Sequence, residues 1–469
     1  MRIYNTFSGK QEELVPLREG ELKIYTCGPT VYDHAHIGNF RAYVFQDVFK
    51  RFLEYLGFKI THVMNITDVD DKTIRNSKNE GVALSVLTRR YELAFFEDLK
   101  MLDIKKPNFC PRATEHINDM VNVIKKLIDK GYSYQGEDGS FYFDISKFKG
   151  YGKLAKLEPK KKERSRVDSD EYGKEEARDF AVWKAHTEAD GDVFWDTEIG
   201  RGRPGWHIEC SAMSAKYLGE TFDVHAGGVD LVFPHHENEI AQAEAASGKQ
   251  FVKYWLHNEH LLVEDKKMSK SHGNYYTLRD LISRGHDPKA VRYLLFATHY
   301  RKRMNFTIKD LKAAENTVNR LVDFVDRLGT RVEGNYNERL SKIGKRAKIK
   351  FVESLNDDMD IRRALAAVFG LVKETNRAME SCEASQKNLE EIRKIMMEFD
   401  GILGFLYPKD EKVNLTDEVM ELIEKRDEAR KNKDFHAADK IRKELSDRGI
   451  VLEDIDGKTL WKVMKKKAA

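Results

Sequence analysis

The chain has 469 residues and a mass of 54.4 kDa, enough for about three domains. Its 41% hydrophobic residues exclude an intrinsically disordered chain, and no apolar run reaches the roughly 18 residues that a membrane-spanning helix needs. With 81 basic and 78 acidic residues the net charge is +3, which neither indicates nor excludes a nucleic-acid partner.

The N-terminal residues are predicted to form a strand, a helix and a second strand. The apolar run Glu21–Cys27 ends at a Gly-Pro pair, and apolar residues then recur at helical spacing from Phe45 to Leu56. A second strand is expected over Lys59–Ile66. This order predicts a parallel sheet, in which ligands bind beyond the carboxyl ends of the strands. Cys27 and the stretch Thr67–Asp71 fall at these ends.

The middle of the chain has a different pattern. Gly131–Asp144 is typical of a hairpin with a glycine turn. The highly charged stretch Pro159–Arg178 is expected to be a solvated, mobile insertion, and its composition does not decide whether it contacts RNA.

The C-terminal part is predicted to be helical. No proline occurs between Pro288 and Pro408, and apolar residues recur at helical spacing, which indicates a helical bundle. Glycines at 329 and 334 are expected to mark one break between helices, and Gly344 another. After the bundle, the sequence predicts a charged helix, a short strand Ile450–Leu452 and a turn near residues 456–457.

Two loops have the residues needed to bind a nucleoside triphosphate. His34 and His36 precede the long helix, whose N-terminus favours phosphate, and Gly38 permits close approach of a nucleotide. Lys267 and Lys270 in the sequence KMSKS can stabilise a reacting α-phosphate and departing pyrophosphate. On composition alone, a solvated surface segment is the more common interpretation of each loop, and the order of the two loops in the chain is what favours a nucleotide site.

Four residues are candidate zinc ligands. His235 and Glu239 are one helical turn apart on one face, whereas His236 and Glu237 are expected to point elsewhere. Cys27 and Cys210 can complete a tetrahedral site. The alternative is a surface His/Glu pair and unrelated buried thiols, because four scattered cysteines are typical of reduced thiols in a cytosolic protein.

Several motifs together resemble one enzyme family. HIGN at 36–39 resembles the HIGH signature of class I aminoacyl-tRNA synthetases, with Asn39 in place of the last histidine, and KMSKS at 267–271 matches their second signature. CGPTVYDHAHIGN, NITDVDDK, GWHIECSAM and FPHHENEIAQ resemble the cysteinyl-tRNA synthetase family within that class. The resemblance extends from about residue 4 to 461.

The resemblance implies an α/β fold, namely a Rossmann-like parallel-sheet catalytic domain with an inserted connective segment, an α-helical bundle and a small α+β anticodon-binding module. The implied domains are 1–115 and 201–275 (the two halves of the catalytic domain), 116–200 (the connective insertion), 276–315 (a stem-contact region), 316–408 (the bundle) and 409–469 (the anticodon module).

The resemblance also implies an activity. L-cysteine would be activated with ATP and Mg²⁺ to cysteinyl-adenylate and transferred to tRNA(Cys), with one Zn²⁺ recognising the substrate thiol. A monomer in the cytoplasm, with no membrane partner, is expected. The implied site residues are Cys27, Cys210, His235 and Glu239 for zinc; Thr67, Trp206 and His225 for cysteine; Gly28, Thr30, His36, Gly38, Asn39 and Lys270 for ATP; His34, His36, Lys267 and Lys270 for catalysis; and Arg430, Asp439, Arg442 and Asp454 for the anticodon.

Two other kinds of protein with different functions would have similar sequences. A ligase that joins activated cysteine to an amino sugar would resemble the same catalytic domain and zinc set, but the anticodon-type module after the bundle argues against it. A non-enzymatic RNA-binding paralogue would be expected to lose Lys270 or a zinc ligand, and all are present.

Overall fold

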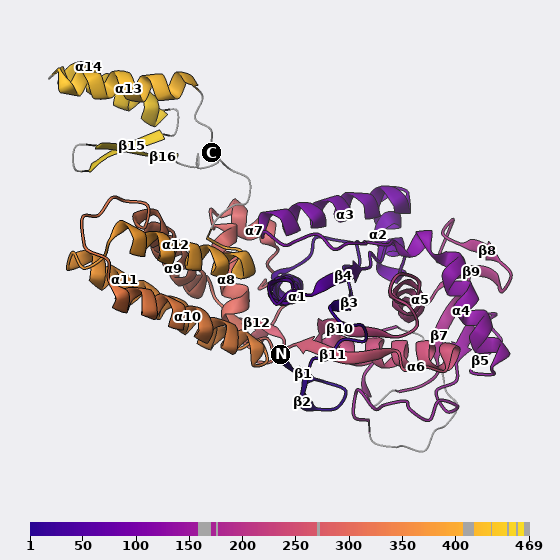
Figure 1. Ribbon diagram of the computed structural model, residues 1–469. Coiled ribbons are helices and arrows are strands. Elements are labelled where there is room, and N and C mark those ends of the chain that lie inside the picture. The colour runs from indigo at the N-terminus through magenta and orange to yellow at the C-terminus, as the bar shows by residue number, and fades with distance from the viewer. Residues whose placement is uncertain are drawn as a thin grey trace. The chain divides into compact units, whose positions relative to one another are not determined.

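The computed structural model describes residues 1–157, 170–174, 177–269, 273–406, 417–432, 434–447, 450–455 and 458–463. The chain forms two compact units, residues 1–407 and 408–469, each with its own elements (Figure 1). In these ranges no helix is both long and apolar enough to cross a bilayer.

A four-stranded parallel sheet forms the centre of the first unit. Its order is β11-β10-β3-β4, and the strands and their first crossover helix are β3 (Glu21–Thr26), α1 (Ile37–Tyr55), β4 (Lys59–Met64), β10 (Phe222–Gly228) and β11 (Val252–Asn258). Ile24 pairs with both His62 and Val224, so the carboxyl ends of three strands meet at one edge. The predicted strand, helix and parallel strand are therefore confirmed.

Helix α1 is buried along most of its length, which explains its many large apolar residues. Phe40, Val44 and Phe52 are fully buried in the core. The helix ends at Tyr55, and Gly57 follows with a φ of 92°, a value that favours glycine.

Segments on both sides of this sheet supply the other elements near its edge. A short N-terminal ribbon consists of β1 (Arg2–Asn5) and β2 (Lys10–Glu13). The next helices are α2 (Asp71–Glu80), α3 (Leu84–Met101), α4 (Ile117–Asp129), α5 (Trp206–Leu218) and α6 (His235–Ser247). Of these, α5 packs on β3 and β4, and α4 and α6 pack on α5. Single 3₁₀ turns occur at Ala113–Glu115 and Val229–Val232.

A second, antiparallel sheet lies in the inserted segment. Its strands, in the order β5-β6-β7-β9-β8, are β5 (Ser133–Gln135), β6 (Phe141–Phe143), β7 (Phe180–Ala185), β8 (Trp195–Thr197) and β9 (Gly200–Pro204). The predicted hairpin is confirmed as β5 and β6. The prediction of a mobile charged stretch falls mainly on residues 158–169 and 175–176, outside the described residues, whereas Tyr172 is hydrogen-bonded to Asn238, 2.9 Å away.

A small three-stranded sheet follows, with β12 (Leu261–Val263) between β13 (Lys266–Lys267) and β14 (Met304–Phe306), together with α7 (Leu278–Ser283) and α8 (Pro288–Ala297). The predicted bundle is confirmed as α9 (Ile308–Arg327), α10 (Glu338–Asn356), α11 (Ile361–Glu380) and α12 (Gln386–Leu403).

The predicted helix break at Gly344 is wrong. Gly344 lies inside α10, and a Cβ at this position would be 2.9 Å from Cδ1 of Ile392 and 3.0 Å from Cδ1 of Ile395. The glycine therefore permits close packing of α10 against α12.

The second unit contains α13 (Asp417–Lys431), α14 (Phe435–Asp447) and an antiparallel pair, β15 (Ile450–Ile455) and β16 (Lys458–Val463). Val419, Ile423, Leu445 and Leu452 form its apolar core. The sequence predicts one charged helix here, whereas the structure has two. Asp434 precedes the second helix, and its side chain accepts a hydrogen bond from the backbone N–H of Ala437 at 3.0 Å, as an N-cap residue does. The predicted strand is confirmed within β15.

Candidate active site

The loop before α1 places His36 at the N-terminus of that helix. His36 is the N-cap residue, and its Nδ1 accepts a hydrogen bond from the backbone N–H of Asn39 at 3.2 Å. Asn39 Oδ1 in turn accepts from the backbone N–H of His36 at 3.1 Å. Burial lowers the pKa of His36 and thereby favours the neutral ring. Since Nδ1 is an acceptor, the ring proton is on Nε2, which can donate to an anion.

The same loop brings other predicted nucleotide-binding residues to the sheet edge. The backbone N–H of Gly28 donates to Asn65 Oδ1 at 2.9 Å, and a Cβ on Gly28 would lie 1.7 Å from the Asn65 carbonyl oxygen, so only glycine fits. Thr30 pairs with Thr67 through a backbone bridge. Within the described residues, His34 Nδ1 is buried without a hydrogen-bond partner, and burial lowers the pKa of this ring.

The second predicted loop lies against the first. Lys267 is exposed at the end of β13, and the Met268 methyl group is 3.3 Å from the position that a Cβ on Gly38 would take. The backbone N–H of Ile37 donates to the carbonyl of Tyr276 at 3.0 Å, which links the start of α1 to the segment after this loop. Lys270 lies outside the described residues.

The four candidate zinc ligands lie together although they come from three separate parts of the chain. Cys27 follows β3, Cys210 lies on α5, and His235 and Glu239 lie on α6. One donor atom from each lies within 4.8 Å of the others. Donors around tetrahedral zinc are about 3.3–3.8 Å apart, so this cluster is close to the required size.

His235 is oriented as metal-bound histidines usually are. Its Nδ1 lies 2.9 Å from Nδ1 of His207, while its Nε2, 3.1 Å from Glu239 Oε1, makes no hydrogen bond within the described residues. One ring nitrogen is thus held by a neighbour, and the other faces the cluster. Burial lowers the pKa of His235 to about 3 and keeps the ring neutral, the form that coordinates metals.

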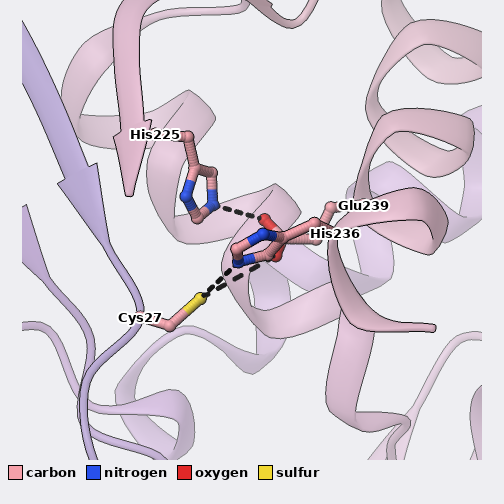
Figure 2. Close-up of side chains that lie close together, drawn as sticks. All are labelled: Cys27, His225, His236 and Glu239. Atoms are coloured by element: carbon pink, nitrogen blue, oxygen red, sulfur yellow. Dashed lines mark hydrogen bonds and ion pairs between the residues drawn. The ribbon is translucent and has the colours of Figure 1, made fainter. Parts of the chain in front are cut away.

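A second, overlapping set of donors shares Cys27 and Glu239 (Figure 2). His236 Nε2 lies 3.3 Å from Cys27 Sγ, and His225 Nε2 lies 3.0 Å from Glu239 Oε2. The expectation that His236 points away from the cluster is therefore wrong, whereas Glu237 does point elsewhere, toward the backbone of Gly152. Helix α6 is buried on all sides at its start, so two consecutive histidines can both face buried groups.

Burial also determines the protonation of the acidic donors. It raises the pKa of the Cys27 and Cys210 thiols and raises the pKa of Glu239 to about 8. A bound cation would reverse this effect by stabilising thiolate and carboxylate.

Two of the three residues predicted to line an amino-acid pocket contact this cluster directly, and the third, Thr67, bonds to Glu209, the residue before Cys210. Trp206 stacks on His235 with ring centroids 4.2 Å apart, and His225 bonds to Glu239 as above. Thr67 is buried three residues after the end of β4 and donates its hydroxyl to Glu209 Oε2 at 2.9 Å. Thr67 Oγ1 also accepts from Asn65 Nδ2 at 3.1 Å.

Sequence reasoning missed four residues of this site, namely Asn65, His207, Glu209 and His236. All four belong to the motifs that carry the family resemblance, which is the only sequence signal that indicates them.

The predicted anticodon residues belong to the second unit. Arg430 lies on α13 and Asp439 and Arg442 on α14, all exposed, and Arg442 Nη2 donates to the Leu452 carbonyl at 3.3 Å. Asp454 lies on β15, and its side chain is outside the described part of the chain.

Comparison with known families shows matches over most of the chain. Residues 13–316 match the family described as tRNA synthetases class I (C) catalytic domain, residues 350–407 match the DALR domain, and residues 413–461 match the cysteinyl-tRNA ligase anticodon binding domain.

Curated proteins of similar sequence include a cysteine–tRNA ligase of Brachyspira hyodysenteriae, 48% identical with 98% of each chain covered. Another cysteine–tRNA ligase, from Solibacter usitatus, is 49% identical and covers 98% of this chain and 99% of its own. A solved methionyl-tRNA synthetase of Mycobacterium tuberculosis shares the fold, with a TM-score of 0.61 and 14% identity over 82% of this chain and 90% of its own.

Proposed function

This chain belongs to the cysteine–tRNA ligase family of class I tRNA synthetases, and from that premise we propose how its residues perform the reaction. The chain is an ATP-dependent ligase that joins cysteine to tRNA(Cys). The full-length match to two relatives at 48% and 49% identity is the observation that carries this function.

The first step forms an adenylate. An oxygen of the cysteine carboxylate attacks the α-phosphorus of magnesium-bound ATP, and the bond to pyrophosphate breaks. His36 donates from Nε2 to a phosphate oxygen, beside the N-terminus of α1, while Gly28 and Gly38 allow the nucleotide to approach the backbone. The ATP-binding residues contributed by the loop before α1 and by its first turn also include Thr30, His34 and Asn39. From the second loop, Lys267 and Lys270 stabilise the charge that develops on the phosphates.

The second step transfers the amino acid. A hydroxyl of the terminal ribose of tRNA attacks the carbonyl carbon of the adenylate, and AMP leaves with the bonding electron pair. No side-chain nucleophile takes part, so catalysis consists of positioning and charge stabilisation.

Cys27, Cys210, His235 and Glu239 are the proposed zinc ligands. The unbonded Nε2 of His235 and the two buried thiols support this assignment, because zinc prefers this donor set. Zinc bound here supplies an electrophile that prefers a thiolate to the hydroxyl of serine. Thr67, Trp206 and His225 form the walls that hold the rest of the substrate cysteine.

The second unit is proposed to bind the anticodon through exposed charged side chains. Arg430, Asp439, Arg442 and Asp454 are the proposed contacts with unstacked bases. The match of residues 413–461 to an anticodon-binding family favours this function over ligation of cysteine to an amino sugar. We further infer that the chain acts as a monomer in the cytoplasm, where translation consumes its product.

Cysteine-dependent exchange of pyrophosphate into ATP, measured with the purified full chain, tests the first step. We expect exchange with cysteine and background rates with serine. Charging of a tRNA(Cys) transcript tests the second step, with a tRNA of another specificity as the control. Absence of cysteine-dependent exchange in zinc-loaded protein would exclude the function.

A further inference from the structure

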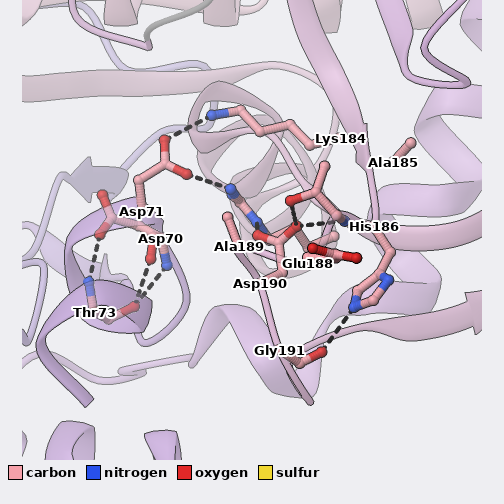
Figure 3. A network of polar contacts seen from close by, with 12 residues as sticks. Asp70, Asp71, Thr73, Lys184, Ala185, His186, Glu188, Ala189, Asp190 and Gly191 are labelled. Carbon is pink, nitrogen blue, oxygen red and sulfur yellow. Dashed lines mark hydrogen bonds and ion pairs between the residues drawn. The ribbon is translucent and has the colours of Figure 1, made fainter. Parts of the chain in front are cut away.

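A network of charged residues, buried except at Asp71, joins the inserted sheet to the start of α2 (Figure 3). Asp71, the first residue of α2, accepts hydrogen bonds through one carboxylate oxygen from Lys184 of β7, at 2.9 Å, and through the other from Arg203 of β9. Lys184 also donates to Asp170 at 2.7 Å, and Arg203 donates from Nε to Asp190 at 2.8 Å. We call these five residues the Asp71 network.

The network is more than a set of surface ion pairs. The side chain of Arg203 is 7% exposed and that of Lys184 is 15% exposed, whereas Asp71 is 51% exposed. Each cation is bonded to two carboxylates, so the desolvation of both cations is compensated. Burial acts to raise the pKa of Asp71, but Lys184 and Arg203 lower it, so this carboxyl is ionised at neutral pH.

The residues at both ends of the Asp71 network are held by further hydrogen bonds to nearby backbone. Asp70, next to Asp71, is the N-cap residue of α2 and accepts from the backbone N–H of Thr73 at 3.0 Å. Asp190 accepts from both the backbone N–H and the hydroxyl of Thr187, each at 2.8 Å. The bond between Asp71 and Arg203 therefore holds the start of α2 close to the end of β9, and does not merely join two side chains.

The segment that leads into α2 and the segment that leads from β9 into α5 carry two residues of the proposed cysteine pocket. Asp71 is four residues after Thr67, and Arg203 is three residues before Trp206, at which α5 begins. The same two segments are joined a second time by the hydrogen bond from Thr67 to Glu209. Two links at different points determine both the separation and the relative orientation of the segments.

We propose that Asp71 and Arg203 are positioning residues that set the distance between Thr67 and Trp206 and thereby the affinity of the pocket for cysteine. The inference rests on the proposed function, because it assumes that these two residues contact the substrate. Neither Asp71 nor Arg203 touches the reacting atoms. Their effect is exerted through the segments they join, and small displacements of positioned groups have large effects on catalysis.

The test is the isosteric variant Asp71→Asn, together with Arg203→Gln and the double variant, in cysteine-dependent ATP–pyrophosphate exchange. We expect KM for cysteine to rise about tenfold in each single variant, while KM for ATP and the zinc content stay unchanged. The double variant should be no worse than the single variants, because the pair acts as a unit. The variant Asp71→Glu, which keeps the charge, should restore most of the affinity for cysteine.

The matched control is Asp196→Asn, which breaks an ion pair with Arg201 between the neighbouring strands β8 and β9. Both partners are more than half exposed, so we expect this variant to leave KM for cysteine unchanged. A general loss of folding would lower the melting temperature and change KM for both substrates.

The salt dependence of KM supplies a second measurement, in which the native chain is compared with Asp71→Asn. Because Asp71 is half exposed, added salt should raise KM for cysteine in the native chain, with little effect in Asp71→Asn. An active native chain whose variants keep their KM for cysteine, or lose affinity for ATP equally, would overturn this inference alone. A native chain without exchange would overturn the proposed function and this inference with it.

Discussion

His36 and Asn39 show how a helix cap can determine the protonation of a functional side chain. The two residues exchange hydrogen bonds between side chain and backbone, and Nδ1 of His36 is used as an acceptor. The ring must then carry its proton on Nε2. Asn39, the departure from the HIGH signature, thus has a structural reason to be present, because its amide oxygen completes the cap.

Replacing Asn39 tests this arrangement. The variant Asn39→Ala should lower the free energy of unfolding by about 1 kcal/mol and raise KM for ATP severalfold, because His36 loses one of its two restraints. Pyrophosphate exchange and urea denaturation measure the two effects.

The control is Ser385→Ala, which removes the N-cap side chain of α12 in the bundle. It should lower stability by a similar amount and leave KM for ATP unchanged. Equal effects of both variants on KM would mean that the cap of α1 has no specific role in ATP binding.

The two overlapping donor sets can be separated by substitution. If Cys27, Cys210, His235 and Glu239 are the ligands, Cys210→Ser should lose bound zinc and affinity for cysteine, while His236→Gln should keep zinc. Cys110→Ser, which alters a thiol outside the cluster, is the control. Metal content measured by mass spectrometry decides, and loss of zinc only in His236→Gln would favour the set that contains His225 and His236.

The protonation of the donors predicts how zinc binding depends on pH. In the metal-free chain the raised pKa values of Cys27, Cys210 and Glu239 leave all three groups protonated at pH 7. Zinc must displace these protons, so its apparent affinity should fall as the pH falls and rise as the pH approaches and exceeds 8. Calorimetry in two buffers of different ionisation enthalpy should show release of about three protons per zinc at pH 7. Heats that do not depend on the buffer would contradict this prediction.

At the scale of elements, two glycines in neighbouring helices have different surroundings. A Cβ on Gly344 of α10 would lie 2.9 Å from Cδ1 of Ile392 and 3.0 Å from Cδ1 of Ile395, whereas a Cβ on Gly370 of α11 would meet no atom within 4 Å. Gly344→Ala gains the same helix preference as Gly370→Ala, but both isoleucine Cδ1 atoms must move to make room, so we expect it to leave the chain less stable than Gly370→Ala does by at least about 1 kcal/mol. Gly370→Ala should stabilise it by about 0.5–1 kcal/mol, because alanine is the better helix former.

Urea denaturation of both variants, with pyrophosphate exchange as the check on the catalytic domain, measures these effects. Equal stabilisation by Gly344→Ala and Gly370→Ala would mean that α10 and α12 pack less closely than they do in this structure.

Gly344 also shows which parts of the fold can be predicted from the sequence and which cannot. Apolar spacing predicts the strand-helix-strand unit and the bundle, and a glycine turn predicts the hairpin, because these patterns depend on residues that are close in sequence. Gly344 was mistaken for a break because its reason lies on another helix. His236 was missed for a similar cause, since the position of Cys27 beside α6 depends on how distant segments pack.

The residues of the site also differ in how far they can be predicted from the sequence. Family motifs indicated Cys27, Cys210, His235 and Glu239, which lie together in the fold. The Asp71 network joins residues as far apart as Asp71 and Arg203, and no spacing rule connects such distant positions.

At the scale of the whole molecule, the proposed function assigns activation of cysteine to the first unit and anticodon binding to the second. The first unit closes its own core before the connection to the second, since Arg292 of α8 donates to the Leu403 carbonyl at 2.7 Å and Asp400 Oδ1 accepts from the backbone of Phe405 at 2.9 Å. The second unit has its own apolar core. Each unit is therefore expected to keep its structure without the other.

Deletion of the chain from Asn414 onward tests this division. The shortened chain should retain cysteine-dependent pyrophosphate exchange, because every proposed residue for cysteine, ATP and zinc lies before the deletion. Charging of tRNA(Cys) should fall by at least about tenfold in kcat/KM, because the proposed anticodon contacts contribute to RNA binding and each lost contact costs roughly 1–3 kcal/mol. The substitution Arg442→Gln in the full chain is the matched control, and it should reproduce part of the loss without affecting exchange. Undiminished charging by the shortened chain would show that the second unit does not read the anticodon, whereas loss of exchange would show that the first unit depends on it.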